Sequence, residues 1–154
     1  MARIDKILTA PNKLLRRKAK PLKIFTRGKC NRIKNLFELM YANNGMGLAA
    51  PQVGWNTRVF IINPTGHKEH EMVFINPIIL ETSGDLVQAT EGCLSVPDVT
   101  GSVERRENIK IAYEDMDGYH VTLEASGLLA RCILHENDHL DGVLFIDKVV
   151  ENAS

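Results

Sequence analysis

The sequence has few cysteines, no net charge and no long apolar run, and each of these absences excludes a class of protein. Its three cysteines are too few and too unevenly spaced for a disulfide framework. Their odd number, in a chain without a signal peptide, favours a reducing compartment. Nineteen basic residues balance nineteen acidic ones, so the net charge gives no reason to expect a nucleic acid or an anionic membrane as a partner.

Signals for membranes and export are missing as well. No run of about 18 apolar residues occurs, so we expect no segment that spans a bilayer. Residues 1–5 lack the apolar core of a signal peptide. These absences predict a cytoplasmic protein.

Length and composition suit one folded unit. The 154 residues are 44% hydrophobic and 25% charged, which is ordinary for a soluble globular protein. They contain no internal repeat, linker or low-complexity segment. We therefore expect a single domain over residues 1–154, with one core.

Hydrophobic periodicity predicts a helix followed by several strands. Apolar side chains recur at helical spacing between residues 33 and 41, and the Asn-Asn-Gly sequence at 43–45 ends the helix. Short segments rich in Val, Ile and Phe predict strands at residues 58–63, 72–76, 78–81, 108–114 and 119–124. The sequence Asp-Met-Asp-Gly at 115–118 predicts a hairpin turn between the last two.

A second helix is expected near the C-terminus. Ser126 is a suitable cap for it, and the Asp-Gly pair at 141–142 ends it. This helix has an apolar side that consists of Leu128, Leu129, Cys132 and Ile133. We therefore expect the helix to be buried. Residues 143–147 predict a last strand. Strands that follow one another without intervening helices favour antiparallel pairing. The predicted fold class is α+β, with mainly antiparallel sheets packed around a central C-terminal helix.

This helix carries the sequence His-Glu-x-x-His. Residues four apart lie on the same helix face, so His135 and His139 can bind one metal ion while Glu136 leans toward a water on it. The alternative is a pair of surface histidines on an amphipathic helix. On a buried helix, however, all three polar side chains need partners, and one metal ion would serve them all.

A catalytic metal centre usually has a third protein ligand. Downstream of the helix the sequence offers only acidic candidates, namely Asp141, Asp147 and Glu151. The remaining histidines lie in or beside turn-like stretches, which makes them weaker candidates: His67, His70 and His120.

Among the cysteines, Cys93 is the candidate ligand. It lies in Glu-Gly-Cys-Leu-Ser, where no hydrophobic periodicity accounts for a cysteine, whereas Cys132 fits the apolar side of the helix and Cys30 has no potential ligand nearby. One thiolate and two imidazoles suit zinc, iron(II), nickel or cobalt, and do not suit magnesium or calcium.

Three separated segments resemble the motifs of one known family. They are Gly-Met-Gly-Leu-Ala-Ala-Pro-Gln at 45–52, Glu-Gly-Cys-Leu-Ser at 91–95 and His-Glu-Asn-Asp-His at 135–139. In this order they resemble the motifs of peptide deformylases, and the likeness extends over residues 4–147. Read alone, the first segment is more typical of a plain connection, so the evidence lies in the three motifs together.

The resemblance implies a role for each matching residue. Cys93, His135 and His139 would hold one divalent metal ion per chain, with iron(II) as the native metal and zinc, nickel or cobalt as substitutes. Glu136 would act as general base and then as general acid. The oxyanion hole would consist of the Gln52 amide and the backbone N–H of Leu94. Positions around the methionine pocket would be Met46, Gly47, Leu128, Arg131 and Cys132.

Some residues depart from the family pattern or from this assignment. Leu134 stands where the family usually has Gln, and Asn137 where it usually has an apolar residue. Arg131 precedes His135 by one helical turn, a spacing that favours the rim of the pocket over its floor. Glu91 and Asp138 are further candidates to orient a ligand by hydrogen bonding.

The function implied is removal of the N-formyl group from the N-terminal formylmethionine of newly made polypeptides, with release of formate. The partners would be nascent N-formylmethionyl peptides near the ribosome, and the enzyme would be a cytoplasmic bacterial monomer. An organellar member of the family is the alternative, although no transit peptide precedes the resemblance. Two other functions remain open: an ordinary metallopeptidase with an acidic third ligand, and a non-catalytic metal-binding domain.

Overall fold

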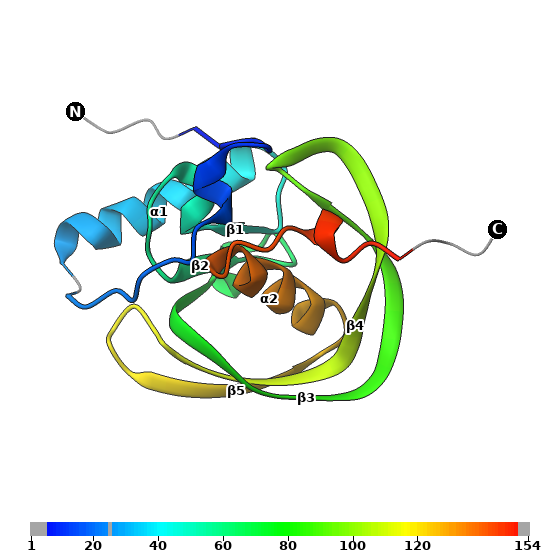
Figure 1. Cartoon of the computed structure of the whole chain (residues 1–154). Coiled ribbons are helices and arrows are strands. Elements are labelled where there is room, and N and C mark those ends of the chain that lie inside the picture. Colours follow the sequence, from blue (N-terminus) through cyan, green and yellow to red (C-terminus); the bar gives the residue numbers. More distant parts are fainter. Residues whose placement is uncertain (1–5, 25, 151–154) are drawn as a thin grey trace.

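The computed structural model describes residues 6–24 and 26–150, and two helices and five strands form its framework (Figure 1). The helices are α1 (Arg27–Ala42) and α2 (Gly127–Leu140). The strands are β1 (Gly47–Ala49), β2 (Val59–Ile62), β3 (Met72–Cys93), β4 (Val96–Glu114) and β5 (His120–Ser126). They form one antiparallel sheet in the order β1-β2-β3-β4-β5, so the α+β prediction is confirmed.

The sheet curves so strongly that it encloses α2. In Figure 1 the long strands β3 and β4 bend around the helix, and β5 passes beneath it. The bending is accompanied by four register irregularities between β3 and β4, which are the places where a strand can change direction. The predicted central position of the C-terminal helix follows from this curvature.

Strand β2 separates two hydrophobic cores. Its side chains alternate between the two faces of the sheet. Phe60 and Ile62 pack with Ile133 of α2, whereas Val59 and Ile61 belong to a second cluster with residues of α1. Both faces of β2 are therefore covered, which explains why all four of its residues are buried.

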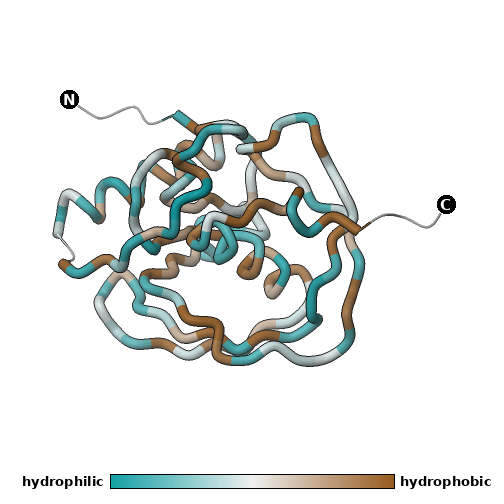
Figure 2. Tube along the Cα trace, in the orientation of Figure 1, coloured by the Kyte–Doolittle hydropathy of each residue, from teal (hydrophilic) through white to brown (hydrophobic). Residues whose placement is uncertain are grey.

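Apolar residues are spread along the chain rather than gathered in one block. Figure 2 shows hydrophobic and hydrophilic segments following one another along the trace. Within the described residues, no helix is long and apolar enough to cross a membrane.

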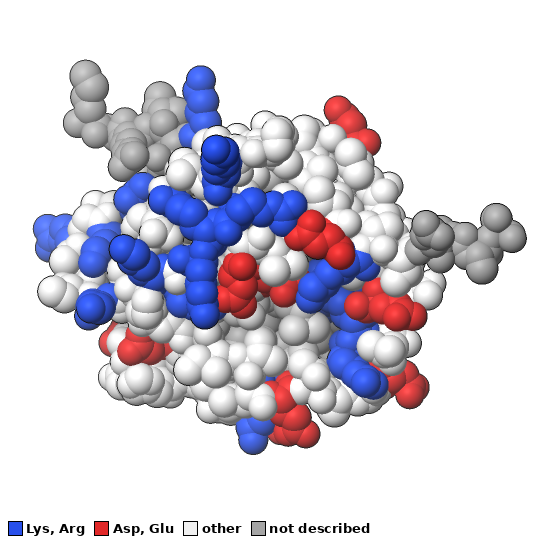
Figure 3. Space-filling view, in the orientation of Figure 1, with Lys and Arg blue, Asp and Glu red and all other residues white. Residues whose placement is uncertain are grey.

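Residues that precede β2 bind the C-terminal end of α2. The last carbonyls of a helix have no partner within it. Here the Leu140 carbonyl accepts hydrogen bonds from the Ala19 N–H at 2.8 Å and from Arg58 Nη1 at 3.0 Å. Arg58 also pairs with Asp141, and Arg16 pairs with Asp147. Figure 3 shows the lysine and arginine side chains gathered over the N-terminal segment and α1.

Several predicted elements differ from the observed ones. Residues 143–147 do not form a strand; Phe145–Asp147 is a short 3-10 helix. Ser126 precedes α2 but makes no capping hydrogen bond with its side chain. The strands predicted at 72–76 and 78–81 are the first part of one continuous strand, β3, whose second half was not predicted.

Candidate metal centre

Cys93, His135 and His139 come together although they lie on two elements. Helix α2 places the two imidazoles one turn apart, with ring centroids separated by 5.2 Å. Cys93 is the last residue of β3, and its Sγ lies 3.4 Å from Nε2 of His139. One potential ligand atom from each residue lies within 4.8 Å of the other two. No other such cluster of His, Cys, Asp and Glu occurs among the described residues.

The chemistry of this cluster fits a transition-metal ion. A thiolate with two imidazoles is a soft to borderline donor set, of the kind that binds zinc and iron(II). Oε1 of the neighbouring Glu136 is buried and has no hydrogen-bond partner among the described residues. Because a buried carboxylate oxygen needs a partner, this atom is available to a water or a substrate in the centre.

The protonation of the cluster reflects burial and negative charge. Burial, together with the positive charge of protonated His135, lowers the pKa of His139 to about 3, which keeps the His139 imidazole neutral. Burial alone would lower the pKa of His135 too, but hydrogen bonding with Cys93 and Glu91 outweighs it and raises that pKa to about 10. A metal ion requires His135 unprotonated, and it competes with the proton for the same negative surroundings. The raised pKa therefore marks a position that favours a positive charge.

Glu136 is poised for proton transfer. It is buried in α2, and Oε2 lies 3.9 Å from Nε2 of His135. Burial raises the pKa of Glu136 to about 7, because removal from water disfavours the carboxylate. A group that titrates near neutral pH can both accept and return a proton.

Glu91 orients His135 and is itself held by arginines. Its Oε1 lies 2.8 Å from Nδ1 of His135, so the other ring nitrogen, Nε2, is left for the metal centre. Burial alone would raise the pKa of Glu91, but hydrogen bonds with His135 and Arg105 lower it to about 2. Arg105 also pairs with Asp138 at 3.0 Å. Sequence reasoning identified Glu91 and Asp138 as candidates but missed Arg105, which no local motif distinguishes.

Gln52 lies in a fixed orientation beside the cluster. It belongs to a 3-10 helix, Ala50–Val53, and its Oε1 accepts a hydrogen bond from the Ala49 N–H at 2.8 Å. Its Nε2 consequently faces the centre, where it donates to Ser95 Oγ at 3.0 Å and lies 3.5 Å from Cys93 Sγ. Leu94 lies in the two-residue turn between β3 and β4. Sequence reasoning missed Ser95 as the partner of the Gln52 amide.

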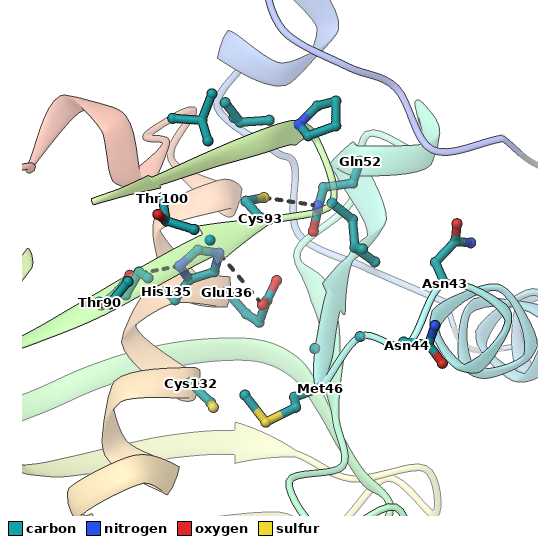
Figure 4. A pocket seen from close by; sticks show the side chains of 18 of the residues that line it. Asn43, Asn44, Met46, Gln52, Thr90, Cys93, Thr100, Cys132, His135 and Glu136 are labelled. Atoms are coloured by element: carbon teal, nitrogen blue, oxygen red, sulfur yellow. Dashed lines mark hydrogen bonds and ion pairs between the residues drawn. The ribbon is translucent and has the colours of Figure 1, made fainter. Parts of the chain in front are cut away.

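A cleft of about 600 Å³ opens beside the cluster. Figure 4 shows Gln52 and Cys93 in one part of it and the sulfur atoms of Met46 and Cys132 in another. Its lining contains the whole set assigned by resemblance to the methionine pocket: Met46, Gly47, Leu128, Arg131 and Cys132. Leu128 is 55% exposed in this cleft, so the prediction that it belongs to the buried side of α2 is wrong.

The alternative ligands lie elsewhere. Asp141 and Asp147 pair with arginines of the N-terminal part, and Glu151 is outside the described residues. None of the remaining histidines and cysteines joins the cluster: His67, His70, His120, Cys30 and Cys132. Of the two departures from the family pattern, Leu134 packs against the core, and Asn137 Oδ1 is buried without a partner among the described residues.

Comparison with known proteins connects this geometry to a family. A family model described as polypeptide deformylase matches residues 4–154. Peptide deformylase 2 of Gloeobacter violaceus is 51% identical over 118 residues, which cover 75% of this chain and 63% of that protein. The peptide deformylase of Chromobacterium violaceum is 43% identical over 143 residues, which cover 93% of this chain and 85% of that protein.

A solved structure agrees with these relatives. The crystal structure of peptide deformylase from Thermotoga maritima superimposes with a TM-score of 0.92 at 37% identity, and the match covers 97% of this chain and 100% of that one. Sequence and fold therefore support the same assignment. The chain belongs to the polypeptide deformylase family, as its three motifs imply.

Proposed function

We propose that this chain removes the formyl group from N-formylmethionyl peptides at a centre where Cys93, His135 and His139 hold one divalent metal ion. The observation that carries the proposal is the convergence of these three side chains beside a buried carboxylate oxygen of Glu136 that has no hydrogen-bond partner in the described part of the chain. The reaction is hydrolysis of the formamide: water adds to the formyl carbon, the C–N bond breaks, and formate and a free amine are released.

The bound metal would polarise a water molecule and lower its pKa toward neutrality. Glu136 accepts the proton from this water, since its raised pKa of about 7 suits it to act near neutral pH. The same carboxyl group then returns the proton to the departing amine nitrogen. One residue thus acts first as base and then as acid.

The oxygen of the formyl group becomes negatively charged as water adds. Nε2 of Gln52 is directed to this region by the hydrogen bond that its Oε1 accepts from the Ala49 N–H. We assign stabilisation of the negative charge to this amide and to the backbone N–H of Leu94. Because the Gln52 side chain is already fixed, it need not reorganise during the reaction.

The cleft would hold the peptide. We assign the methionine side chain to the apolar part of the cleft near Met46, Leu128 and Cys132. Strand β1 is an edge strand, so its outer edge can pair with an extended peptide. The residues after methionine would then run along β1.

The remaining assignments belong to the same proposal. We assign iron(II) as the native metal, with zinc, nickel or cobalt able to replace it. The chain would act as a cytoplasmic monomer, a single domain over residues 1–154, on nascent peptides near the ribosome.

The test is formate release from a short N-formylmethionyl peptide, with protein purified without oxygen and loaded with iron(II) or nickel. We expect formate and a new free amine in equal amounts, and no reaction with the N-acetylmethionyl analogue. Cleavage of internal peptide bonds without formate release would support an ordinary metallopeptidase. One bound metal per chain with no hydrolysis of any of these peptides would support a non-catalytic domain.

A further inference from the structure

Arg131 lines the cleft, but its guanidinium donates hydrogen bonds to neighbouring groups of the protein itself. Nη1 donates to Oε2 of Glu91 at 2.6 Å and to the carbonyl of Val103 at 3.0 Å. Nη2 donates to the carbonyl of Val87 at 2.6 Å. Val87 lies on β3 and Val103 on β4, so this side chain ties α2 to both strands.

The carboxylate of Glu91 is fully occupied by donors. Oε1 interacts with His135 Nδ1 at 2.8 Å and with Arg105 Nη2 at 2.9 Å. Oε2 accepts from Arg105 Nε at 2.7 Å and from Arg131 Nη1 at 2.6 Å. Two contacts on each oxygen fill the acceptor sites that a carboxylate offers. Glu91 therefore cannot rotate without breaking hydrogen bonds.

The orientation of Glu91 determines the orientation of His135. Glu91 holds Nδ1 of the ring, which leaves Nε2 for the metal centre. The side chain of Arg105 is 4% exposed and pairs with Glu91 in the interior. The side chain of Arg131 is 12% exposed and covers the carboxylate of Glu91 on the side of the cleft. Without Arg131, Oε2 would keep one donor, and the cleft side of the carboxylate would be open to water.

We propose that Arg131 is a positioning residue for His135, acting through Glu91, and that it does not select the methionine side chain. This inference rests on the proposed metal centre and deepens it. It also changes the role that resemblance gave to Arg131, because all of its described contacts are to Glu91 and the two strands.

The shape of arginine suits this role better than that of lysine. Its planar fork presents several N–H donors in fixed directions, and here they reach one carboxylate and two carbonyls. Lysine has a single ammonium group at this position and can keep the ion pair with Glu91 while losing the link to Val87. An Arg131→Lys variant should therefore fall between the wild type and Arg131→Met.

The experiment compares Arg131→Met, Arg131→Lys and the wild type, with Arg106→Met as a matched control. Arg106 is an exposed arginine on β4 whose Nη1 donates to the carbonyl of Gly84. Each protein is loaded with cobalt(II), and its absorption spectrum is recorded because the d–d bands report the geometry of the ligands without turnover. Deformylation is then measured with formylmethionyl and formylnorleucyl peptides.

We expect Arg131→Met to alter the cobalt spectrum and to lower kcat by about tenfold to a hundredfold, the usual range for a residue that orients a metal ligand. The ratio of kcat/KM between the two peptides should stay within about twofold of the wild-type ratio. Arg131→Lys should recover part of the spectrum and of kcat, and Arg106→Met should match the wild type.

An unchanged cobalt spectrum combined with a changed peptide ratio would overturn the inference and return Arg131 to the pocket. If Arg131→Met does not fold, Arg131→Lys decides: a wild-type spectrum and kcat would overturn the inference, and an intermediate spectrum and kcat would support it. Failure of the proposed function is distinguishable, because the wild type itself would then release no formate.

Discussion

Gly47 lies against the carboxylate of Glu136, with no room for a side chain between them. A Cβ atom on Gly47 would lie 2.6 Å from Glu136 Oε2 and 2.9 Å from its Cγ and Cδ. At these distances a Cβ atom on Gly47 would force the carboxylate of Glu136 out of its position. The absence of a side chain on β1 is therefore what allows the proposed general base to occupy its position.

Gly47→Ala should abolish most of the activity without unfolding the protein. The added methyl group must displace Glu136, which removes the base from the centre but leaves the metal ligands in place. We expect at least a tenfold loss of kcat with one metal ion still bound per chain. Formate release and metal analysis on the same preparation would check this. Gly28→Ala is the control, because its Cβ would meet no atom of the described residues closer than 3.8 Å.

Gln52→Ala should reduce kcat much more than it raises KM. In the wild type, the hydrogen bond that Gln52 Oε1 accepts from the Ala49 N–H orients the amide. The variant removes one donor to the charged oxygen of the transition state. Loss of one such donor costs about a hundredfold or more in rate. Steady-state kinetics with a formylmethionyl peptide would measure both parameters. A rise in KM of similar size with kcat unchanged would contradict the role of Gln52 in the oxyanion hole.

Acid should destabilise the metal-free protein through Glu91. The pKa of this residue is about 2 in the folded protein and 4.5 for the unperturbed group, so the folded state binds fewer protons between these values. Its contribution to stability is present above pH 4.5 and is lost as the pH falls toward 2. Urea unfolding at several pH values should show this decline.

The Glu91→Gln variant should flatten the decline between pH 4.5 and 2. It should also lower the free energy of unfolding at pH 7 by about 3 kcal/mol or more, because Arg105 loses its main partner in a buried site. The exposed Glu69→Gln variant controls for the loss of one carboxylate. An equally steep decline in Glu91→Gln would show that other groups control acid unfolding.

Gly142→Ala should destabilise the fold far more than Gly118→Ala. Both glycines have positive φ, 75° and 85°, so alanine carries a backbone penalty of roughly 1 kcal/mol at either position. A Cβ on Gly142 would also clash with the backbone of Arg16, whereas one on Gly118 would meet no atom within 4 Å in residues 6–24 and 26–150. Thermal unfolding of the two variants should therefore give a clearly larger fall in Tm for Gly142→Ala. Equal falls would contradict the close packing of the N-terminal segment on the end of α2.

The sequence predicted the parts of the centre that depend on local spacing. His135 and His139 follow from the four-residue repeat of a helix, and Glu136 follows from its place in the same motif. Cys93 could be proposed because it follows a glycine in a segment where no hydrophobic periodicity accounts for a cysteine. Helix α1 and the class of the fold followed from periodicity and from the order of the elements.

The contacts between distant residues could not be predicted in the same way. The second half of β3 is mostly exposed and polar, so it lacks the alternation that marks a half-buried strand. Arg105 and Glu91 are brought together by the pairing of β3 and β4, and neither residue has a local signal for the other. The region after α2 was misassigned because its apolar residues pack as a 3-10 helix stabilised by Arg16 and Asp147.

The most direct test of the central claim is to measure metal content and formate release together for Glu136→Gln. This substitution keeps the size of the side chain and removes its ability to accept a proton. We predict one metal ion per chain, as in the wild type, and a loss of at least a thousandfold in formate release. Activity close to that of the wild type would contradict the role of Glu136, and loss of the metal would show that this residue helps to hold the ion.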